Sequence, residues 1–151
     1  MQVKARTRRV IIADSNRIAI DMTKRIVRRR SPIHGNGVFA ACDLPARTEI
    51  IEYRGRRLTH AQANRAYGND ARWINHSCAP NCQAWVIEHA SGDPRKDRVV
   101  IETRRLIRQG EELTYDYGIT LEERQTAKLK RIWACRCGAK KCTGTLLKPK
   151  H

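Results

Sequence analysis

The sequence predicts a single, mainly β domain made of many short strands and closed by a cysteine-rich segment. Apolar and β-branched residues occur in short runs, and turn-forming residues such as those at 34–37 and 90–94 separate these runs. Helical periodicity is confined to short stretches. A chain of 151 residues has room for one domain with a modest core. None of its apolar runs approaches the ~18 residues that span a membrane.

The strands are expected to follow one another without repeats or a linker. Residues 1–24 are interpreted as a basic N-terminal extension, whose apolar patch at residues 10–13 is a candidate strand. From residue 25 the β-branched runs predict strands, because such side chains favour a pleated, half-buried backbone. The first two are joined through His34–Gly37, a turn signal made of glycine and asparagine. Strands are expected over residues 25–33, 38–44, 48–53, 82–89, 98–103 and 112–117.

Two short helices complete the predicted fold. The first covers residues 59–67 and ends at Gly68, because glycine is the usual residue beyond a helix C-terminus. The second covers residues 121–132, where Leu121, Leu129 and Ile132 form its apolar side. The chain is therefore divided into the extension 1–24, a β domain at 25–120, a helix at 121–132, and a cysteine knuckle with a basic tail at 133–151.

The net charge of +16 is concentrated at the two ends of the chain. Residues 1–31 carry a net charge of +8 and residues 124–151 one of +9, whereas residues 32–123 sum to −1. A near-neutral body with two basic ends favours attachment to a polyanion through those ends. The alternative is that the basic ends only keep the protein soluble. No basic segment is interleaved with aromatic residues, so sequence-specific reading of nucleic acid is not indicated.

Three of the six cysteines lie close together, as Cys135, Cys137 and Cys142. The N-terminus lacks the apolar stretch of a secretion signal, so we expect an intracellular protein with a metal site rather than a disulfide framework. Structural zinc prefers four soft ligands in a tetrahedron, so a fourth ligand must come from elsewhere in the chain. A loop of three reduced thiols is the alternative. The candidates for the fourth ligand are Cys42, Cys78, Cys82 and His76.

The segment Arg72–Cys82 is dense in polar side chains, with Asn75, His76, Ser77 and Asn81 around a proline. This density is unusual for a plain loop and indicates a binding segment. A polar turn whose groups satisfy one another is one alternative. A glycosylation acceptor at residues 75–77 is another, which the missing secretion signal disfavours.

Two smaller patterns add to this candidate site. Tyr115 and Tyr117, two of only four tyrosines, are expected on the same face of one strand. The glycines of His34–Gly37 permit positive φ angles and let a ligand lie against the backbone. Paired core tyrosines and an ordinary hairpin turn are the respective alternatives.

Taken together and in this order, these segments resemble the SET-domain protein-lysine methyltransferases. The resemblance covers residues 26–147. A short chain that ends in such a knuckle is most similar to small bacterial SET proteins, and chromatin enzymes carry the same post-SET knuckle. The family implies a mainly β SET fold of several short curved sheets with a pseudoknot, short helices and a C-terminal zinc knuckle. The matching segments are His34–Gly37 with Val38-Phe39-Ala40, Glu52-Tyr53-Arg54-Gly55, Arg72–Cys82, Glu112–Tyr117 and Cys135–Cys142.

The resemblance also implies roles for single residues. Tyr117 matches the tyrosine at the methyl-transfer point, and Tyr53 matches a second tyrosine of the lysine channel. Tyr115 takes a position where a hydroxyl holds a water and leaves less room for added methyl groups, which predicts mono- or dimethylation. Cys78 matches the fourth zinc ligand, beside Cys135, Cys137 and Cys142. The cofactor-binding residues implied are His34, Gly35, Asn36, Gly37, Arg72, Asn75, His76 and Trp133.

The implied function is S-adenosylmethionine-dependent methylation of lysine in a histone or a histone-like basic protein. The expected compartment is the cytoplasm of a bacterium, or the nucleus and chromosomes of a eukaryote, with structural zinc and no membrane partner. The alternative is a catalytically impaired SET-type zinc module that docks on chromatin or nucleic acid through its basic ends. A purely structural zinc protein is a third interpretation.

One block expected in the family is missing from this sequence. Tyr67 and Gly68 lead directly into Asn69, where family members carry additional strands and part of the wall of the substrate groove. Its loss bears on substrate binding and activity. It also predicts an exposed edge strand, which is a route to association with other chains.

Overall fold

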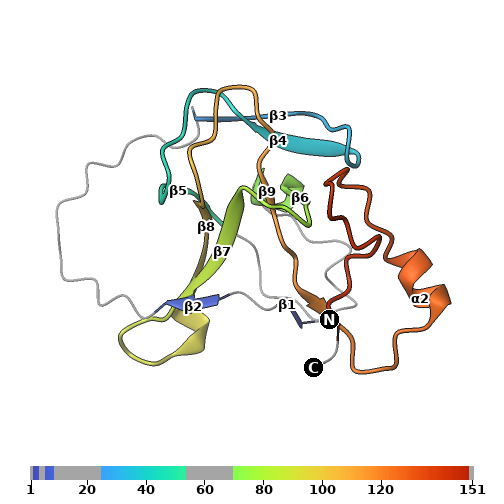
Figure 1. Cartoon of the computed structure of the whole chain (residues 1–151). Coiled ribbons are helices and arrows are strands. Elements are labelled where there is room, and N and C mark those ends of the chain that lie inside the picture. Colours follow the sequence, from blue (N-terminus) through green and yellow to red (C-terminus); the bar gives the residue numbers. More distant parts are fainter. Residues whose placement is uncertain (1, 4–5, 9–24, 54–69, 150–151) are drawn as a thin grey trace, which may run out of the picture.

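A computed structural model describes residues 2–3, 6–8, 25–53 and 70–149 of the chain. The candidate strand at residues 10–13, the predicted helix at 59–67 and the junction at Tyr67–Asn69 lie outside these residues. Strands make up most of the described secondary structure (Figure 1). The helical elements are η2 (Asp70–Trp73), η3 (Pro94–Lys96) and α2 (Ala127–Ile132). The strands are β1 (Gln2–Val3), β2 (Arg6–Arg8), β3 (Ile26–Arg30), β4 (Asn36–Ala40), β5 (Glu49–Glu52), β6 (Asn75–His76), β7 (Cys82–Ile87), β8 (Arg98–Thr103), β9 (Thr114–Tyr115) and β10 (Ile119–Thr120).

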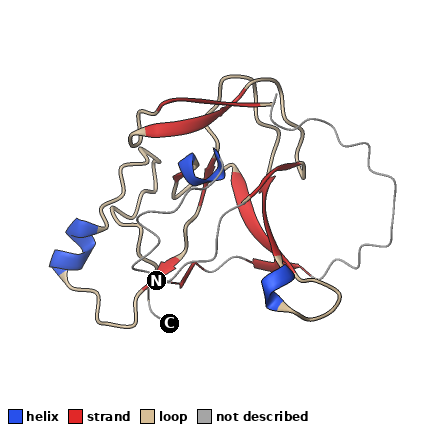
Figure 2. Ribbon diagram, turned by 180° about the vertical axis from the view of Figure 1, so that it is seen from behind, coloured by secondary structure: helices blue, strands red, loops and turns tan. Residues whose placement is uncertain are grey.

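The described strands form four small sheets. The largest has the order β2-β7-β8-β5, in which β7 and β8 make an antiparallel hairpin and β2 runs parallel to β7. Three two-stranded sheets join β1 with β10, β3 with β4, and β6 with β9. Seen from behind in Figure 2, α2 and η3 lie at opposite sides of the strands. The prediction of a mainly β fold with several short sheets is confirmed.

The β3–β4 hairpin turns earlier than the sequence pattern predicted. Arg30 pairs with Asn36, so Asn36 and Gly37 belong to a strand and not to the turn. The side chain of Ser31 explains this shift, because its hydroxyl oxygen accepts hydrogen bonds from the backbone N–H groups of Ile33 and His34. The backbone of Ser31 also donates to the carbonyl of Gly35, which has a φ angle of 52°.

The chain from Ile107 to Tyr117 passes beside several other segments in turn. Ile107 exchanges two backbone hydrogen bonds with Leu44, and the N–H of Leu113 donates to the carbonyl of Val38 at 2.7 Å. The next residues form β9, which is parallel to β6. The backbone of this segment changes its hydrogen-bond partner from one part to the next. The strand predicted over residues 112–117 is therefore reduced to β9. This path carries the tyrosine pair to the polar segment of β6.

The core lies where β4, β5, β7 and β8 meet this passing segment. Cys82 is fully buried there, and burial raises the pKa of its thiol to about 12. A cysteine in such an apolar environment packs as a small hydrophobic residue. The buried core cluster consists of Val38, Ala40, Leu44, Ile50, Ile74, Cys82, Ile101, Ile107 and Leu113.

The helix predicted over residues 121–132 is shorter than expected and begins at Ala127. Thr126 is its N-cap, since its hydroxyl accepts a hydrogen bond from the N–H of Leu129 at 3.2 Å. After the helix the chain folds back, and Leu147 forms a bridge with Ile119. Among the described residues, no helix has the length and apolar character to cross a membrane.

Candidate functional site

Four cysteine side chains converge beside β6. Cys78 follows β6, whereas Cys135, Cys137 and Cys142 belong to the segment after α2. Their sulfur atoms all lie within 4.8 Å of one another, and the Cys78 sulfur is 3.8 Å from that of Cys135 and 3.9 Å from that of Cys142. A tetrahedral ion with four sulfur ligands at ~2.3 Å separates those sulfurs by ~3.8 Å. The four thiols therefore fit a tetrahedral metal ion such as zinc.

The thiol pKa values in this cluster shift in opposite directions. Burial raises the pKa of Cys135, burial and neighbouring cysteines raise that of Cys142 despite the N–H of Gly144, and the pKa of Cys137 is lowered. The N–H of Cys78 donates to the Cys137 sulfur, and the N–H of Gly144 donates to the Cys142 sulfur, both at 3.4 Å. Burial alone would raise the pKa of the Cys137 thiol, but the N–H groups of Cys78 and Ala139 and the neighbouring cysteines lower this pKa to about 6. The thiolate is the form that binds a metal.

Of the four candidates for a fourth ligand, the structure brings Cys78 to the knuckle. Cys82 lies in the hydrophobic core, and Cys42 is an exposed thiol outside the cluster. His76 approaches Cys78 without joining the four sulfurs, since its Nε2 atom is 3.5 Å from the Cys78 sulfur. All six cysteines are free thiols, so the structure has no disulfide between them.

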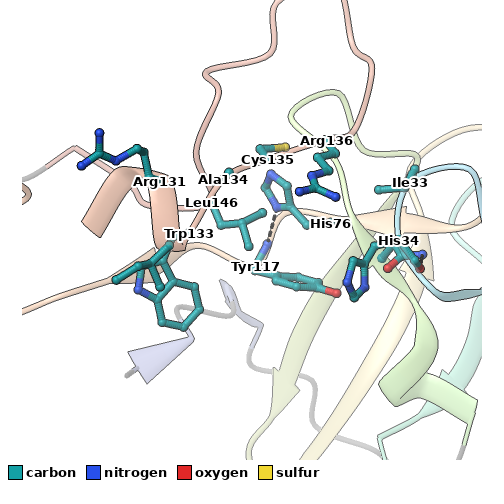
Figure 3. Close-up of a pocket in the computed structure, with 12 residues that line it drawn as sticks. Ile33, His34, His76, Tyr117, Arg131, Trp133, Ala134, Cys135, Arg136 and Leu146 are labelled. Atoms are coloured by element: carbon teal, nitrogen blue, oxygen red, sulfur yellow. Dashed lines mark hydrogen bonds between the residues drawn. The ribbon is translucent and has the colours of Figure 1, made fainter. Parts of the chain in front are cut away.

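A pocket of about 380 Å³ lies between the β3–β4 turn, β6 and the cysteine segment (Figure 3). This volume is in the range of small-molecule binding sites. Figure 3 shows the indole of Trp133 on one side of the phenol of Tyr117 and the imidazole of His34 on the other. Four of the predicted cofactor-binding residues line the pocket together with Tyr117. These four are His34, Asn75, His76 and Trp133.

The other four predicted cofactor-binding residues do not line this pocket. Gly35 shapes the hairpin turn, whereas Asn36 and Gly37 lie in β4. The carbonyl of Asn36 supports the site indirectly, because it accepts a hydrogen bond from the side chain of Asn75 at 3.0 Å. Arg72 lies in η2, where its guanidinium stacks over the ring of Trp73 at 4.4 Å from the centroid.

His76 connects the pocket to the cysteine cluster. Its Nδ1 atom accepts a hydrogen bond from the backbone N–H of Tyr117 at 3.2 Å, and its Nε2 atom faces the sulfur of Cys78. A nitrogen that accepts cannot also carry the proton, so the neutral ring holds its proton on Nε2. Burial lowers the pKa of His76, Asp116 partly opposes this change, and Lys148 adds to it. The ring therefore stays neutral at pH 7 and directs an N–H group toward the sulfur.

The tyrosines gather beside the pocket. The ring centroids of Tyr115 and Tyr117 are 4.9 Å apart, and the Tyr117 hydroxyl donates to the carbonyl of Ile74 at 2.9 Å. Burial, with the charges of Tyr53 and Glu112, raises the pKa of Tyr117 to about 12. Burial also raises the pKa of Tyr115. Both hydroxyls are therefore protonated at neutral pH, and Tyr53, which is 38% exposed, lies on the solvent side of the group.

Sequence reasoning missed several residues that build this site. The wall beside Trp133 comes from residues of α2 and the knuckle. The one sequence signal that could have found these residues is that they are neighbours of Trp133 in the chain. Ser31 was also missed, and Glu112 was named only as part of a matching segment, although the two hold Asn75 and the hairpin turn in place. The additional residues that line the pocket are Ile33, Arg131, Ile132, Ala134, Cys135, Arg136 and Leu146.

Comparison with known proteins assigns the class. The family model of the SET domain matches residues 56–118. The chain therefore matches the SET domain over these residues, and it is homologous to histone-lysine methyltransferases. It is 34% identical to human histone-lysine N-methyltransferase 2D over 152 residues, which cover 83% of this chain and 3% of that protein. It is 35% identical to histone-lysine N-methyltransferase set-2 of Caenorhabditis elegans over 144 residues, which cover 78% of this chain and 9% of that protein. For human histone-lysine N-methyltransferase 2B the identity is 37% over 139 residues, with 75% and 5% of the two chains covered.

The chain thus spans less than a tenth of the length of these curated relatives. The alignment with human 2D is 152 positions long, but only 83% of this 151-residue chain takes part in it. The alignment therefore contains gaps in this chain. Such gaps agree with the prediction that a block of the family is missing here. The predicted position of that block, after Gly68, stays a prediction because residues 54–69 lie outside the described part of the chain.

Proposed function

We propose that this chain is an S-adenosylmethionine-dependent protein-lysine N-methyltransferase. The observation that carries the proposal is the convergence of a pocket of small-molecule size, a tyrosine pair beside it and a four-cysteine cluster whose segment forms one wall of the pocket. The names of the relatives, which are histone-lysine N-methyltransferases, support the same function.

The pocket offers groups that suit S-adenosylmethionine. Trp133 presents an aromatic face on which a base can stack. Arg136 brings a guanidinium group that pairs well with a carboxylate. Asn75 and His76 add buried polar groups to the lining of the pocket. When bound, S-adenosylmethionine supplies an electrophilic methyl group attached to a positively charged sulfur.

Tyr117 is proposed to orient the amine of the substrate lysine. That amine has a pKa of ~10.4 in water and must lose its proton before it can attack. An apolar channel and a nearby positive charge both disfavour the ammonium form. Because Tyr117 donates its own proton to the carbonyl of Ile74, its oxygen lone pairs remain available to accept from the amine. Catalysis would then depend on positioning and electrostatics.

Zinc is proposed to be structural and to be held by Cys78, Cys135, Cys137 and Cys142. Four thiolates fill every position of a tetrahedral ion, so no position is left for a reacting ligand. The ion would tie the knuckle to the end of β6 and so keep Trp133 at the wall of the pocket.

The proposed substrate is a lysine in a histone or another basic protein, as the relatives suggest. The test is incubation of the zinc-loaded chain with a labelled methyl donor and core histones. We expect label on lysine in the wild type and a strong loss of label in Asn75→Ala, because that change removes a buried polar group from the pocket. Glu111→Gln is the matched control, since Glu111 pairs with Arg105 outside the pocket. Absence of transfer by the wild type to any core histone would contradict the proposed function.

A binding module without turnover is the second candidate. It is favoured by exposed basic residues on α2 and the knuckle, namely Lys128, Lys130, Arg131, Lys140 and Lys141. The same experiment separates the two functions, because a module would give no label and would bind DNA with an affinity that falls steeply with salt.

The products of methylation are expected to depend on Tyr115. The ring of Tyr115 lies 4.9 Å from that of Tyr117, and its hydroxyl is proposed to hold a water and so limit the room for added methyl groups. We therefore expect Tyr115→Phe to shift the products of a histone peptide from mono- and dimethyl-lysine toward dimethyl- and trimethyl-lysine, as measured by mass spectrometry at matched total turnover. If the variant and the wild type give the same methylation states, the proposed product specificity is wrong.

A further inference from the structure

Glu112 connects three segments that are far apart in the sequence. Its carboxylate accepts hydrogen bonds from the hydroxyl of Ser31 at 2.7 and 2.9 Å, and from the amide Nδ2 of Asn75 at 2.8 Å. It also lies directly against β4, since a Cβ atom added at Gly37 would collide with its Oε1 atom. Glycine at this position is what lets the carboxylate reach the backbone.

The surroundings of Asn75 fix which way its amide points. The Nδ2 atom lies within hydrogen-bond distance of three groups that can only accept, which are the carbonyls of His34 and Asn36 at 3.2 and 3.0 Å and the carboxylate of Glu112. Only the nitrogen end of the amide can face such a set. The Oδ1 atom must therefore point the other way, and none of the described residues donates a hydrogen bond to it.

Asn75 is 8% exposed and lines the pocket. A buried amide oxygen without a partner is costly unless a ligand or water satisfies it. Among the described residues, every side-chain oxygen or nitrogen that is shut off from solvent has a hydrogen-bond partner. Because none of the described residues donates to the Oδ1 atom of Asn75, this atom is not shut off and remains open to the pocket. A donor group of a bound ligand, such as an ammonium, would complete the hydrogen bonding of Asn75.

We propose that Glu112 is a positioning residue of this site: its carboxylate holds the amide of Asn75 so that Oδ1 faces the bound methyl donor. The inference rests on the proposed function, because it names the ligand as S-adenosylmethionine. Among the described residues that line the pocket, Asn75 is the one that donates a hydrogen bond to the Glu112 carboxylate, and the proposed positioning acts through that side chain. An amide in place of the carboxylate could pair with either end of Asn75. Only the carbonyls of His34 and Asn36 would then still favour the present orientation, so the amide of Asn75 would be held less firmly.

The test is a double-mutant cycle on binding of S-adenosylmethionine, measured by titration calorimetry on the zinc-loaded full chain. We expect Glu112→Gln to weaken binding about tenfold, since it removes a charge-assisted hydrogen bond. In the Asn75→Ala background the same change should have almost no further effect, because the group that it positions is gone. Glu111→Gln, the matched control at the neighbouring glutamate, should bind like the wild type.

Two outcomes would overturn the inference alone: wild-type affinity in Glu112→Gln, or an equal loss in both backgrounds, which would indicate a general structural role. Wild-type protein that binds no S-adenosylmethionine would overturn the proposed function, and the inference with it. Thermal melts show whether Glu112→Gln folds. If it does not fold, Ser31→Ala removes a donor to the same carboxylate with less disturbance and should show a smaller loss that likewise disappears in Asn75→Ala.

Discussion

Tyr117→Phe is expected to lower the rate of methyl transfer by about 100-fold or more while the fold and the cofactor affinity change little. The hydroxyl is the only atom removed, and the ring keeps its contacts with Tyr115 and His76, whose centroids lie 4.9 and 5.4 Å away. The structural loss is one hydrogen bond to the carbonyl of Ile74, which costs about 1 kcal/mol of unfolding free energy. The rate suffers more, because the amine of the substrate loses the oxygen that orients it.

The measurement is single-turnover transfer of labelled methyl to a histone peptide, with the melting temperature and the dissociation constant of S-adenosylmethionine determined on the same samples. A large loss of rate with a small change in both other quantities supports a role for Tyr117 at the reacting atoms. If affinity and rate fall together, Tyr117 is only part of the pocket wall. A variant that transfers methyl groups as fast as the wild type would remove Tyr117 from the catalytic site.

Cys137→Ser is expected to abolish zinc binding and, with it, the binding of S-adenosylmethionine. A serine hydroxyl does not ionise near neutral pH, whereas the environment of Cys137 lowers its thiol pKa to about 6. Structural zinc sites of small proteins contribute on the order of 10 kcal/mol to folding. A tenfold fall in cofactor affinity corresponds to a loss of only ~1.4 kcal/mol of binding free energy. Loss of the ordered knuckle and its Trp133 wall should therefore lower the cofactor affinity by more than tenfold.

Native mass spectrometry should find one zinc ion in the wild type and none in Cys137→Ser. Cys42→Ser is the matched control, because Cys42 is an exposed thiol outside the cluster, and it should keep both zinc and cofactor affinity. A wild-type chain that is folded and free of metal would contradict the zinc assignment. A Cys137→Ser variant that loses zinc yet binds S-adenosylmethionine normally would separate the knuckle from the pocket.

The sequence predicted best the features that depend on neighbouring residues. Short β-branched runs give short strands because their side chains favour an extended backbone, and the hairpin Cys82–Ile87 with Arg98–Thr103 has nearly the bounds expected. The closely spaced cysteines of the knuckle indicated a metal site because that spacing brings several thiols to one place. The polar segment around Asn75 and the tyrosine pair were found for the same reason, since their residue types are unusual over a short distance.

Where local preference competed with a distant partner, the sequence was less successful. The hydroxyl of Ser31 moved the hairpin turn ahead of Asn36, although glycine and asparagine marked the later position as the turn. The strand expected over residues 112–117 is short because each part of it pairs with another segment. The helix after residue 120 starts late, at its Thr126 cap, and residues 121–126 do not continue it.

By itself, the sequence indicated that this chain forms a mainly β domain with a cysteine knuckle, and that its polar and aromatic segments resemble those of the SET domain. Only the tertiary structure decided which distant side chains meet. The cysteine spacing had left Cys42, Cys78, Cys82 and His76 open, and the family resemblance had indicated Cys78. The structure brings Cys78 to the knuckle, which begins 57 residues away, and places Glu112 against Asn75 across 37 residues. The physical reason is that such contacts depend on how β6 and β9 align side by side. That alignment is set by burial of the shared core, which no short stretch of sequence reveals.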